Sequence, residues 1–145
     1  MMTIDRGEVA AFLQKHRAAL AGRDVSALCA DYTPDAVIVS PMFATLRGRA
    51  AIEASFRAFY TAFPDATTEF EATIVDPPHA ALFTTVHATH EAEFFGIPGT
   101  HRRIEVQVAW HLTFEGGLIA HERRVYDFTG LLLQIGVLRA KPAKP

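Results

Sequence analysis

The segment ERRVYDF, residues 122–128, holds the densest group of side chains that could do chemistry. Glu122 can exchange a proton with a substrate, Arg124 can bind a carboxylate or stabilise an enolate oxygen, and Tyr126 can orient a ligand through its hydroxyl. Glu122 and Arg124 are either an ion pair that closes one end of the fold or the polar floor of an apolar pocket. A small-molecule site needs such a floor, with a few polar groups converging in an apolar pocket.

Further candidates lie outside this pair. Asp127 either joins the site or caps the helical turn that follows it. His90 shares a side of its predicted strand with Val86 and Ala88, so it is either a hydrogen-bonded core residue or an acid/base group. The candidates for ligand-stacking walls, which could equally be core side chains, are Trp110, Phe59 and Phe95.

Histidine is frequent, with seven residues, which raises the question of a metal site. His87 and His90 are three apart on a predicted strand, so they point to opposite faces and cannot share an ion. His111 and His121 are expected to pair across a hairpin on the face away from the pocket, without a third ligand. We therefore predict no functional metal.

Composition limits the class of protein. The 145 residues suit a single domain spanning 1–145, half of them are hydrophobic, and the net charge is −2 with scattered basic residues. This pattern disfavours nucleic acid or an anionic membrane as a partner. The start MMTIDRGE lacks an apolar leader, and no run reaches membrane-spanning length, so a cytoplasmic location is expected.

The first half of the chain has helical patterns. Asp5 and Glu8 form a predicted capping box, and the helix they open ends near Gly22. Asp24 can cap a second helix over 25–32, a short strand is predicted over 33–41, and a third helix over 47–64. On this third helix an apolar stripe lies on one face: Ile52, Phe56, Phe59 and Phe63.

The second half alternates with the period of strands. Strands are predicted over 67–76, 80–95, 102–114 and 118–128, followed by a closing helical turn over 130–136 with Gly136 just past its end, and a mobile tail over 138–145. Helices followed by antiparallel strands predict an α+β fold, in which the N-terminal helices cover one face of a curved sheet. Such a sheet can close into a cone with a cavity under the helices.

The loop of the last hairpin decides which side chains face this cavity. The preferred prediction is a three-residue loop, Glu115 to Gly117, which pairs Glu122 with Trp110 and Arg124 with Val108 and turns both charges toward the apolar face. A two-residue Gly-Gly loop slips the register by one and turns His121, Arg123 and Asp127 inward instead.

Two segments carry a resemblance to a known family. DFTGLLLQIG at 127–136 resembles the closing D-x-x-G-x-L-x-Q-L-G segment of the SnoaL-like polyketide cyclases, in the nuclear transport factor 2-like superfamily. HEAEFFGIPGTHRR at 90–103 resembles that family's H-x-G-x-x-x-G-x-P-P-T-x-R-R segment without a gap. Weaker matches upstream, at 21–37 and 47–59, extend the resemblance over nearly the whole chain.

The resemblance implies a cone-shaped α+β barrel, a homodimer, and a deep pocket between sheet and helices. It further implies cofactor-independent acid/base chemistry on a small hydrophobic, carbonyl-bearing molecule, such as ring closure, isomerisation or dehydration. Related superfamily members include proteins with no catalytic role, so the alternative for this chain is a non-catalytic protein that binds a small molecule in the same pocket. His90 matches a family histidine. The family's catalytic aspartate falls on Arg124 and a second pocket position on Trp110, and since arginine cannot act as a base at neutral pH, Glu122 is the best replacement.

Overall fold

The computed structural model describes residues 3–42 and 44–139 of the chain. Its elements, in chain order, are α1 (Arg6–Ala21), α2 (Val25–Ala30), β1 (Tyr32–Val39), β2 (Leu46–Arg47), α3 (Arg49–Ala62), β3 (Thr67–Asp76), β4 (His79–Thr89), β5 (Arg103–Glu115), β6 (Leu118–Val125) and α4 (Phe128–Gln134). The predicted caps are confirmed: Asp5 and Glu8 cap α1 reciprocally, Asp24 caps α2, and Gly136 follows α4 with φ +84°. Residues 140–145 of the predicted tail lie outside the described part.

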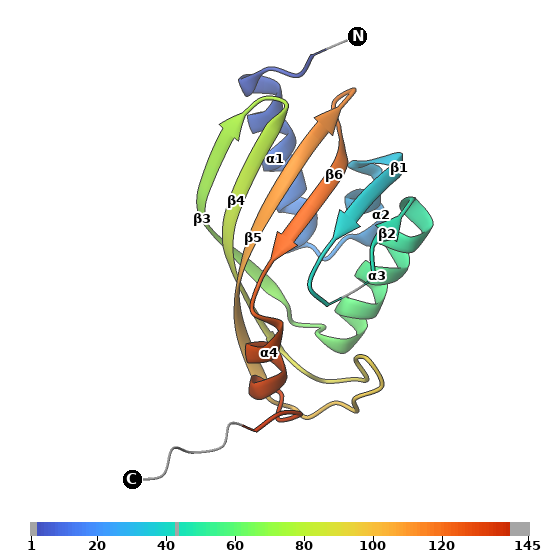
Figure 1. Ribbon diagram of the computed structural model, residues 1–145, viewed down its shortest axis with the longest axis vertical. Helices are drawn as coiled ribbons and strands as arrows, with labels where there is room; N and C mark the ends of the chain where they lie inside the picture. The colour runs from blue at the N-terminus through green and yellow to red at the C-terminus, as the bar shows by residue number, and fades with distance from the viewer. Residues whose placement is uncertain (1–2, 43, 140–145) are drawn as a thin grey trace.

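The six strands form one curved sheet in the order β2-β1-β6-β5-β4-β3. Helices α1, α2 and α3 lie against one face of the sheet, and α4 follows β6 at the lower end of Figure 1. The predicted α+β class with helices on one face is confirmed. The sheet stays open, because β2 and β3 are its two edges and do not pair with each other.

The last hairpin differs from the preferred prediction. Glu115 pairs with Leu118, so the loop is the two-residue Gly116-Gly117, and both glycines have positive φ (58° and 80°) as a tight hairpin turn requires. The register then shifts, since Phe114 pairs with Ile119 but Thr113 pairs with His121, which leaves Ala120 as an extra residue on β6.

This bulge restores the face that the short loop would have reversed. Glu122 lies opposite Leu112 and Arg124 opposite Trp110, two positions from the predicted partners but on the inner face. The expectation that a two-residue loop turns His121, Arg123 and Asp127 inward is therefore wrong, because that reasoning assumed a regular ladder.

Several elements also differ from the sequence pattern in their bounds, and one strand was not predicted. The strand predicted over 80–95 ends at Thr89, and residues 90–102 form a loop whose Phe94 is buried against Phe59 and Phe63. Burial of that ring holds the segment off the sheet. The two-residue strand β2 was not predicted, and Tyr32, expected at the end of the second helix, opens β1.

Candidate functional site

A pocket lies between α3 and the inner face of the sheet. The pocket is partly open to solvent. Helix α3 contributes Ser55, Phe56, Phe59 and Tyr60, and β5 contributes Ile104, Val106, Val108 and Trp110. The pocket exists at this place because the apolar residues of β5 alternate inward under the aromatic face of α3.

Arg124 supplies the charged group of this wall. Its side chain is 12% exposed, and its Nε–H donates a 2.6 Å hydrogen bond to Oε2 of Glu122. The guanidinium carbon lies 4.7 Å from the ring centroid of Trp110 and 5.4 Å from that of Phe56. Cation–π contacts of this kind suit a guanidinium in an apolar setting, so Arg124 is held by both charge and stacking.

Glu122 lies behind Arg124 and does not line the pocket. It is fully buried, and its two carboxylate oxygens accept hydrogen bonds from Arg124 and from the Tyr32 hydroxyl, the latter at 2.7 Å. Burial and the Glu122 carboxylate raise the pKa of Tyr32 well above its ordinary value, so Tyr32 stays a neutral donor. The carboxylate is thus satisfied from both sides.

The guanidinium keeps its charge and has donors to spare. Burial alone would lower the pKa of Arg124, but the adjacent Glu122 carboxylate outweighs burial and raises it. One N–H goes to Glu122 and a further contact reaches Tyr32, so some of the five N–H donors of a guanidinium stay available to a ligand.

The other polar side chains of the pocket wall differ in how they are used. The indole N–H of Trp110 donates to Thr84 Oγ1 at 2.8 Å, so that ring offers the pocket its aromatic surface. Burial raises the pKa of Tyr126, whose hydroxyl interacts with Ser40. Burial also raises the pKa of Tyr60. Both tyrosines are therefore neutral at pH 7.

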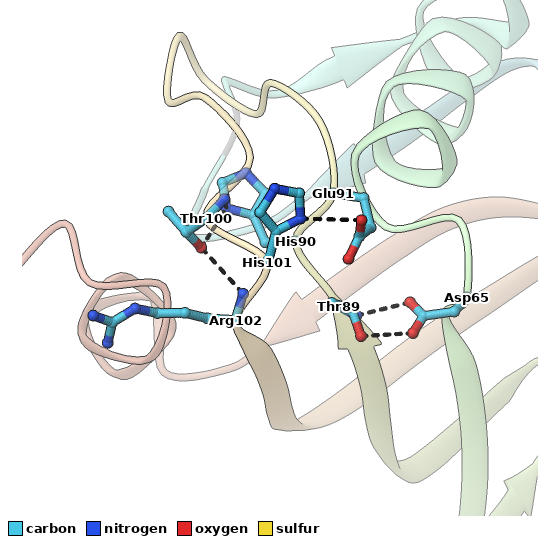
Figure 2. Close-up of polar contacts among 7 residues, drawn as sticks. All are labelled: Asp65, Thr89, His90, Glu91, Thr100, His101 and Arg102. Atoms are coloured by element: carbon cyan, nitrogen blue, oxygen red, sulfur yellow. Dashed lines mark hydrogen bonds and ion pairs between the residues drawn. The ribbon is translucent and has the colours of Figure 1, made fainter.

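His90 is closed off from the pocket. It is fully buried, packs 5.4 Å from the Phe63 ring and is absent from the pocket wall. Thr100 reaches Nδ1 through its hydroxyl (3.1 Å) and its backbone N–H (3.3 Å), as Figure 2 shows for the hydroxyl. An Nδ1 that accepts from a backbone N–H leaves the ring proton on Nε2, which has no partner among the described residues.

Asp127 and Phe95 also lie away from the pocket wall. The Asp127 side chain accepts the backbone N–H of Gly130 at 2.8 Å, so the predicted helix cap is confirmed. Phe95 lies at the exposed tip of the 90–102 loop, is 50% exposed, and contacts Phe94 and Phe128.

The structure thus brings together part of the predicted set at the pocket. Arg124, Trp110, Tyr126 and Phe59 line it, whereas Glu122 supports it from behind. Sequence reasoning missed Tyr60 and Tyr32. Tyr60 had a usable signal, because it lies four residues after Phe56 on the same helical face. Tyr32 had none, because its pattern was assigned to a helix.

The predicted histidine pair on the outer face is also rearranged. His111 lies opposite Arg123 and His121 opposite Thr113, and Nε2 of His111 is 3.1 Å from Nδ1 of His79. Within residues 3–42 and 44–139, no three His, Cys, Asp or Glu side chains are grouped so that they could hold a metal ion. No helix in this part of the chain is long and apolar enough to cross a membrane.

Chemically, the pocket can enclose an apolar molecule and donate hydrogen bonds to an oxygen on it. Charged donors in a site with little water stabilise negative charge that develops on such an oxygen. The described lining residues include no carboxylate and no imidazole, so proton abstraction by a group in direct contact with a ligand has no obvious agent there.

One protein-family model matches most of the chain. The model of the SnoaL-like polyketide cyclase family matches residues 10–135. The chain is similar to AclR of Streptomyces galilaeus, a candidate hydroxylase, with 27% identity and a TM-score of 0.81 over 95% of this chain and 91% of that one. No curated protein matches.

Two further solved structures share the fold. A candidate SnoaL-like polyketide cyclase from Jannaschia is 15% identical, with a TM-score of 0.83 over 94% of this chain and 99% of that one. IdmH of Streptomyces antibioticus, a candidate polyketide cyclase, is 24% identical, with a TM-score of 0.73 over 88% of this chain and 97% of that one.

Proposed function

This chain belongs to the SnoaL-like polyketide cyclase family, and on that premise we propose that its pocket binds a small hydrophobic molecule bearing a carbonyl group. Arg124 donates a hydrogen bond to the carbonyl oxygen and stabilises the enolate that forms when an adjacent carbon loses a proton. This is the chemistry of a cofactor-independent cyclase or isomerase.

The observation that carries the proposal is the charged guanidinium of Arg124 on an otherwise largely apolar wall. A protein does not leave a charge beside apolar side chains without compensation, and here Glu122 and Tyr32 supply it. In a purely structural ion pair we would expect both side chains to be enclosed, but here only Glu122 is enclosed. Arg124 reaches the pocket, where a ligand can use its remaining donors.

The Glu122–Arg124 ion pair also favours an uncharged ligand over an anionic one. Because Glu122 neutralises Arg124, the site as a whole carries no net charge. A ligand carboxylate would have to give up its hydration and then meet a guanidinium that is already paired, whereas a carbonyl has little hydration to lose. A carbonyl-bearing ligand therefore fits this wall better than an apolar carboxylate does.

The proton acceptor is not one of the described side chains that line the pocket. Glu122, His90 and Asp127 keep their predicted acid/base roles only as hypotheses, and the first two are enclosed in the structure. We propose that Glu122 acts through Arg124 as a positioning residue and that hydroxide entering at the pocket mouth takes the proton and leaves as water.

Binding without turnover is the second candidate. It is favoured by the lack of a carboxylate or imidazole among the described lining residues. In that case the same contacts give affinity and specificity, and Arg124 is an anchor rather than a stabiliser of an enolate.

A binding experiment tests the shared part of both candidates. Acetonaphthone presents an aryl ketone, and isopropylnaphthalene has nearly the same shape without the oxygen. By isothermal titration calorimetry, we expect the protein to bind the ketone about tenfold more tightly or better, as one or two good hydrogen bonds supply. Quenching of Trp110, the single tryptophan, locates the ketone in the pocket. Equal affinities would contradict the proposal.

An exchange experiment separates the two candidates. Enolisation replaces the methyl protons of acetonaphthone with deuterium in D₂O, and NMR follows the loss of their signal. An enzyme accelerates this exchange above the buffer rate and Arg124→Met abolishes the acceleration; a binding protein leaves the rate unchanged while still binding. Loss of exchange in Glu122→Gln with binding retained would show that exchange requires the Glu122 carboxylate, either to position Arg124 or to accept the proton.

The family also implies a homodimer without a cofactor, and we propose both for this chain, in the cytoplasm. The outer face of the sheet supports a dimer. Phe83, Ala109 and Val125 lie in one row across β4, β5 and β6, and Phe83 and Val125 are 42% and 58% exposed. Exposed apolar side chains gathered on one face are typical of an interface.

A further inference from the structure

The phenol of Tyr60 is a polar group of the pocket wall that nothing in the proposed function uses. Tyr60 lies one helical turn after Phe56 on α3, and their rings stack with centroids 6.3 Å apart. Phe56 is also the ring that the Arg124 guanidinium contacts. Tyr60 and Arg124 therefore both pack on the same aromatic side chain and both line the pocket.

The hydroxyl of Tyr60 makes no hydrogen bond to any residue in the described part of the chain. It is not enclosed either: in that part, the fully enclosed side-chain polar atom that has neither a hydrogen bond nor an ion pair is His90 Nε2, since Asp31 Oδ1 pairs with the Lys15 ammonium at 3.0 Å. A hydroxyl that has no hydrogen-bond partner in the protein and is not enclosed is accessible to a molecule in the space beside it. For a side chain of the pocket wall, that space is open to a ligand or water.

Tyr60 is a donor at neutral pH and shares an electrostatic environment with Arg124. Burial raises the pKa of Tyr60, and the positive charges of Arg124 and Arg23 offset only part of that rise. The phenol therefore keeps its proton.

We propose that Tyr60 is the second hydrogen-bond donor to the ligand oxygen that Arg124 binds. A carbonyl oxygen has two lone pairs and can accept from both groups at once. Two donors, one charged and one neutral, form an oxyanion site that tightens as the carbonyl becomes an enolate. The ligand class narrows to hydrophobic molecules, such as aryl ketones, whose inward-facing oxygen is uncharged. This inference rests on the proposed function.

The test compares the wild-type protein with the Tyr60→Phe variant in their affinities for two ligands, acetonaphthone and isopropylnaphthalene. Tyr60→Phe removes the hydroxyl and keeps the ring that stacks on Phe56. We expect this variant to bind acetonaphthone about five- to tenfold more weakly and isopropylnaphthalene with unchanged affinity, since one neutral hydrogen bond is lost. Thr61→Val is the matched control, because it deletes a neighbouring hydroxyl that donates to the Arg57 carbonyl on the exposed side of α3. Thermal unfolding checks that both variants are folded.

The outcomes separate this inference from the proposed function. A ketone-selective loss in Tyr60→Phe, absent from Thr61→Val, supports the second donor. No loss, or an equal loss for both ligands, overturns the role of Tyr60 while the wild-type preference for the ketone still supports Arg124. If the wild-type protein shows no preference for the ketone, the proposed function fails and the Tyr60 role fails with it.

Discussion

At the scale of single residues, the Glu122–Arg124 pair combines a structural cost with a functional use. Removing two charges from water costs several kcal/mol each, and good geometry with additional hydrogen bonds is needed to offset that cost. Here the Tyr32 hydroxyl donates an additional hydrogen bond to Glu122. Cation–π contacts with Trp110 and Phe56 stabilise the Arg124 guanidinium. These contacts stabilise the buried pair while some N–H donors of Arg124 stay available to a ligand.

The first prediction separates stability from binding at Arg124. Arg124→Met leaves the Glu122 carboxylate buried without its charged partner, so we expect a loss of about 3 kcal/mol in the free energy of unfolding, measured by urea titration. The double variant Glu122→Gln/Arg124→Met removes both charges and should regain most of that stability. Ketone binding should stay lost in both. Recovered binding in the double variant would show that the guanidinium is not the ligand contact.

A second buried carboxylate, Asp31, makes the free energy of unfolding depend on pH in the acid range. Burial alone would raise the pKa of Asp31, but hydrogen bonds from His16 (2.8 Å) and Lys15 outweigh it, and the pKa lies below its ordinary value. A depressed carboxyl pKa contributes stability above the unfolded-state value of about 4, which is lost as pH falls through the folded-state pKa.

The second prediction follows from this sign. Asp31→Asn should reduce the free energy of unfolding by about 1–3 kcal/mol at pH 7, because the donors of His16 and Lys15 lose an anionic acceptor. The difference between variant and wild type should persist at about pH 5 and shrink only below about pH 4. Urea unfolding across this range measures it. A difference that is constant down to pH 3 would mean that ionisation of Asp31 is not responsible.

At the scale of elements, the bulge at Ala120 positions the site. The short Gly-Gly loop and the extra residue each shift the side-chain alternation by one, and together they return Glu122 and Arg124 to the inner face. The sequence predicted the correct face through an incorrect loop. Apolar alternation identified the inner face of β5, but nothing in Leu118–Ala120 marks a bulge, because its cause is pairing with β5 and β1 rather than local preference.

The third prediction tests the turn that starts this register. Gly116 and Gly117 have φ of 58° and 80°, and a Cβ on either would meet no atom within 4 Å. The effect of substitution is therefore conformational. Gly116→Asn should be neutral or slightly stabilising, because asparagine tolerates the left-handed region, whereas Gly117→Ala should cost about 1 kcal/mol. Chemical denaturation compares them, and equal losses would contradict the proposed turn geometry.

At the scale of the whole molecule, the sequence predicted the order of helices and strands more accurately than their ends. The caps of α1 and α2 and the bounds of β3 followed from local signals, as did the placement of helices on one face. The end of β4 did not, because Phe94 leaves the sheet to fill a core between Phe59 and Phe63. The pocket wall was predicted in part, since faces of strands are readable but contacts between α3 and β6 are not.

The fourth prediction concerns assembly. If the outer face of the sheet forms the proposed homodimer, Phe83→Glu places a charge in its centre and should give a monomer by light scattering coupled to size exclusion. Val137→Glu is the matched control, because Val137 is similarly exposed (43%) but lies after α4, outside that row. A wild-type monomer at high concentration, or a dimer in Phe83→Glu, would contradict this assembly.

The central claim is that Arg124 presents its guanidinium to an oxygen of a hydrophobic ligand inside the pocket. A crystal structure of the protein with acetonaphthone tests it most directly. We predict the naphthyl ring against Trp110 and Phe59, with the ketone oxygen about 2.7–3.2 Å from a guanidinium nitrogen of Arg124. A ketone bound elsewhere on the molecule, or bound in the pocket with its oxygen directed away from Arg124, would contradict the account.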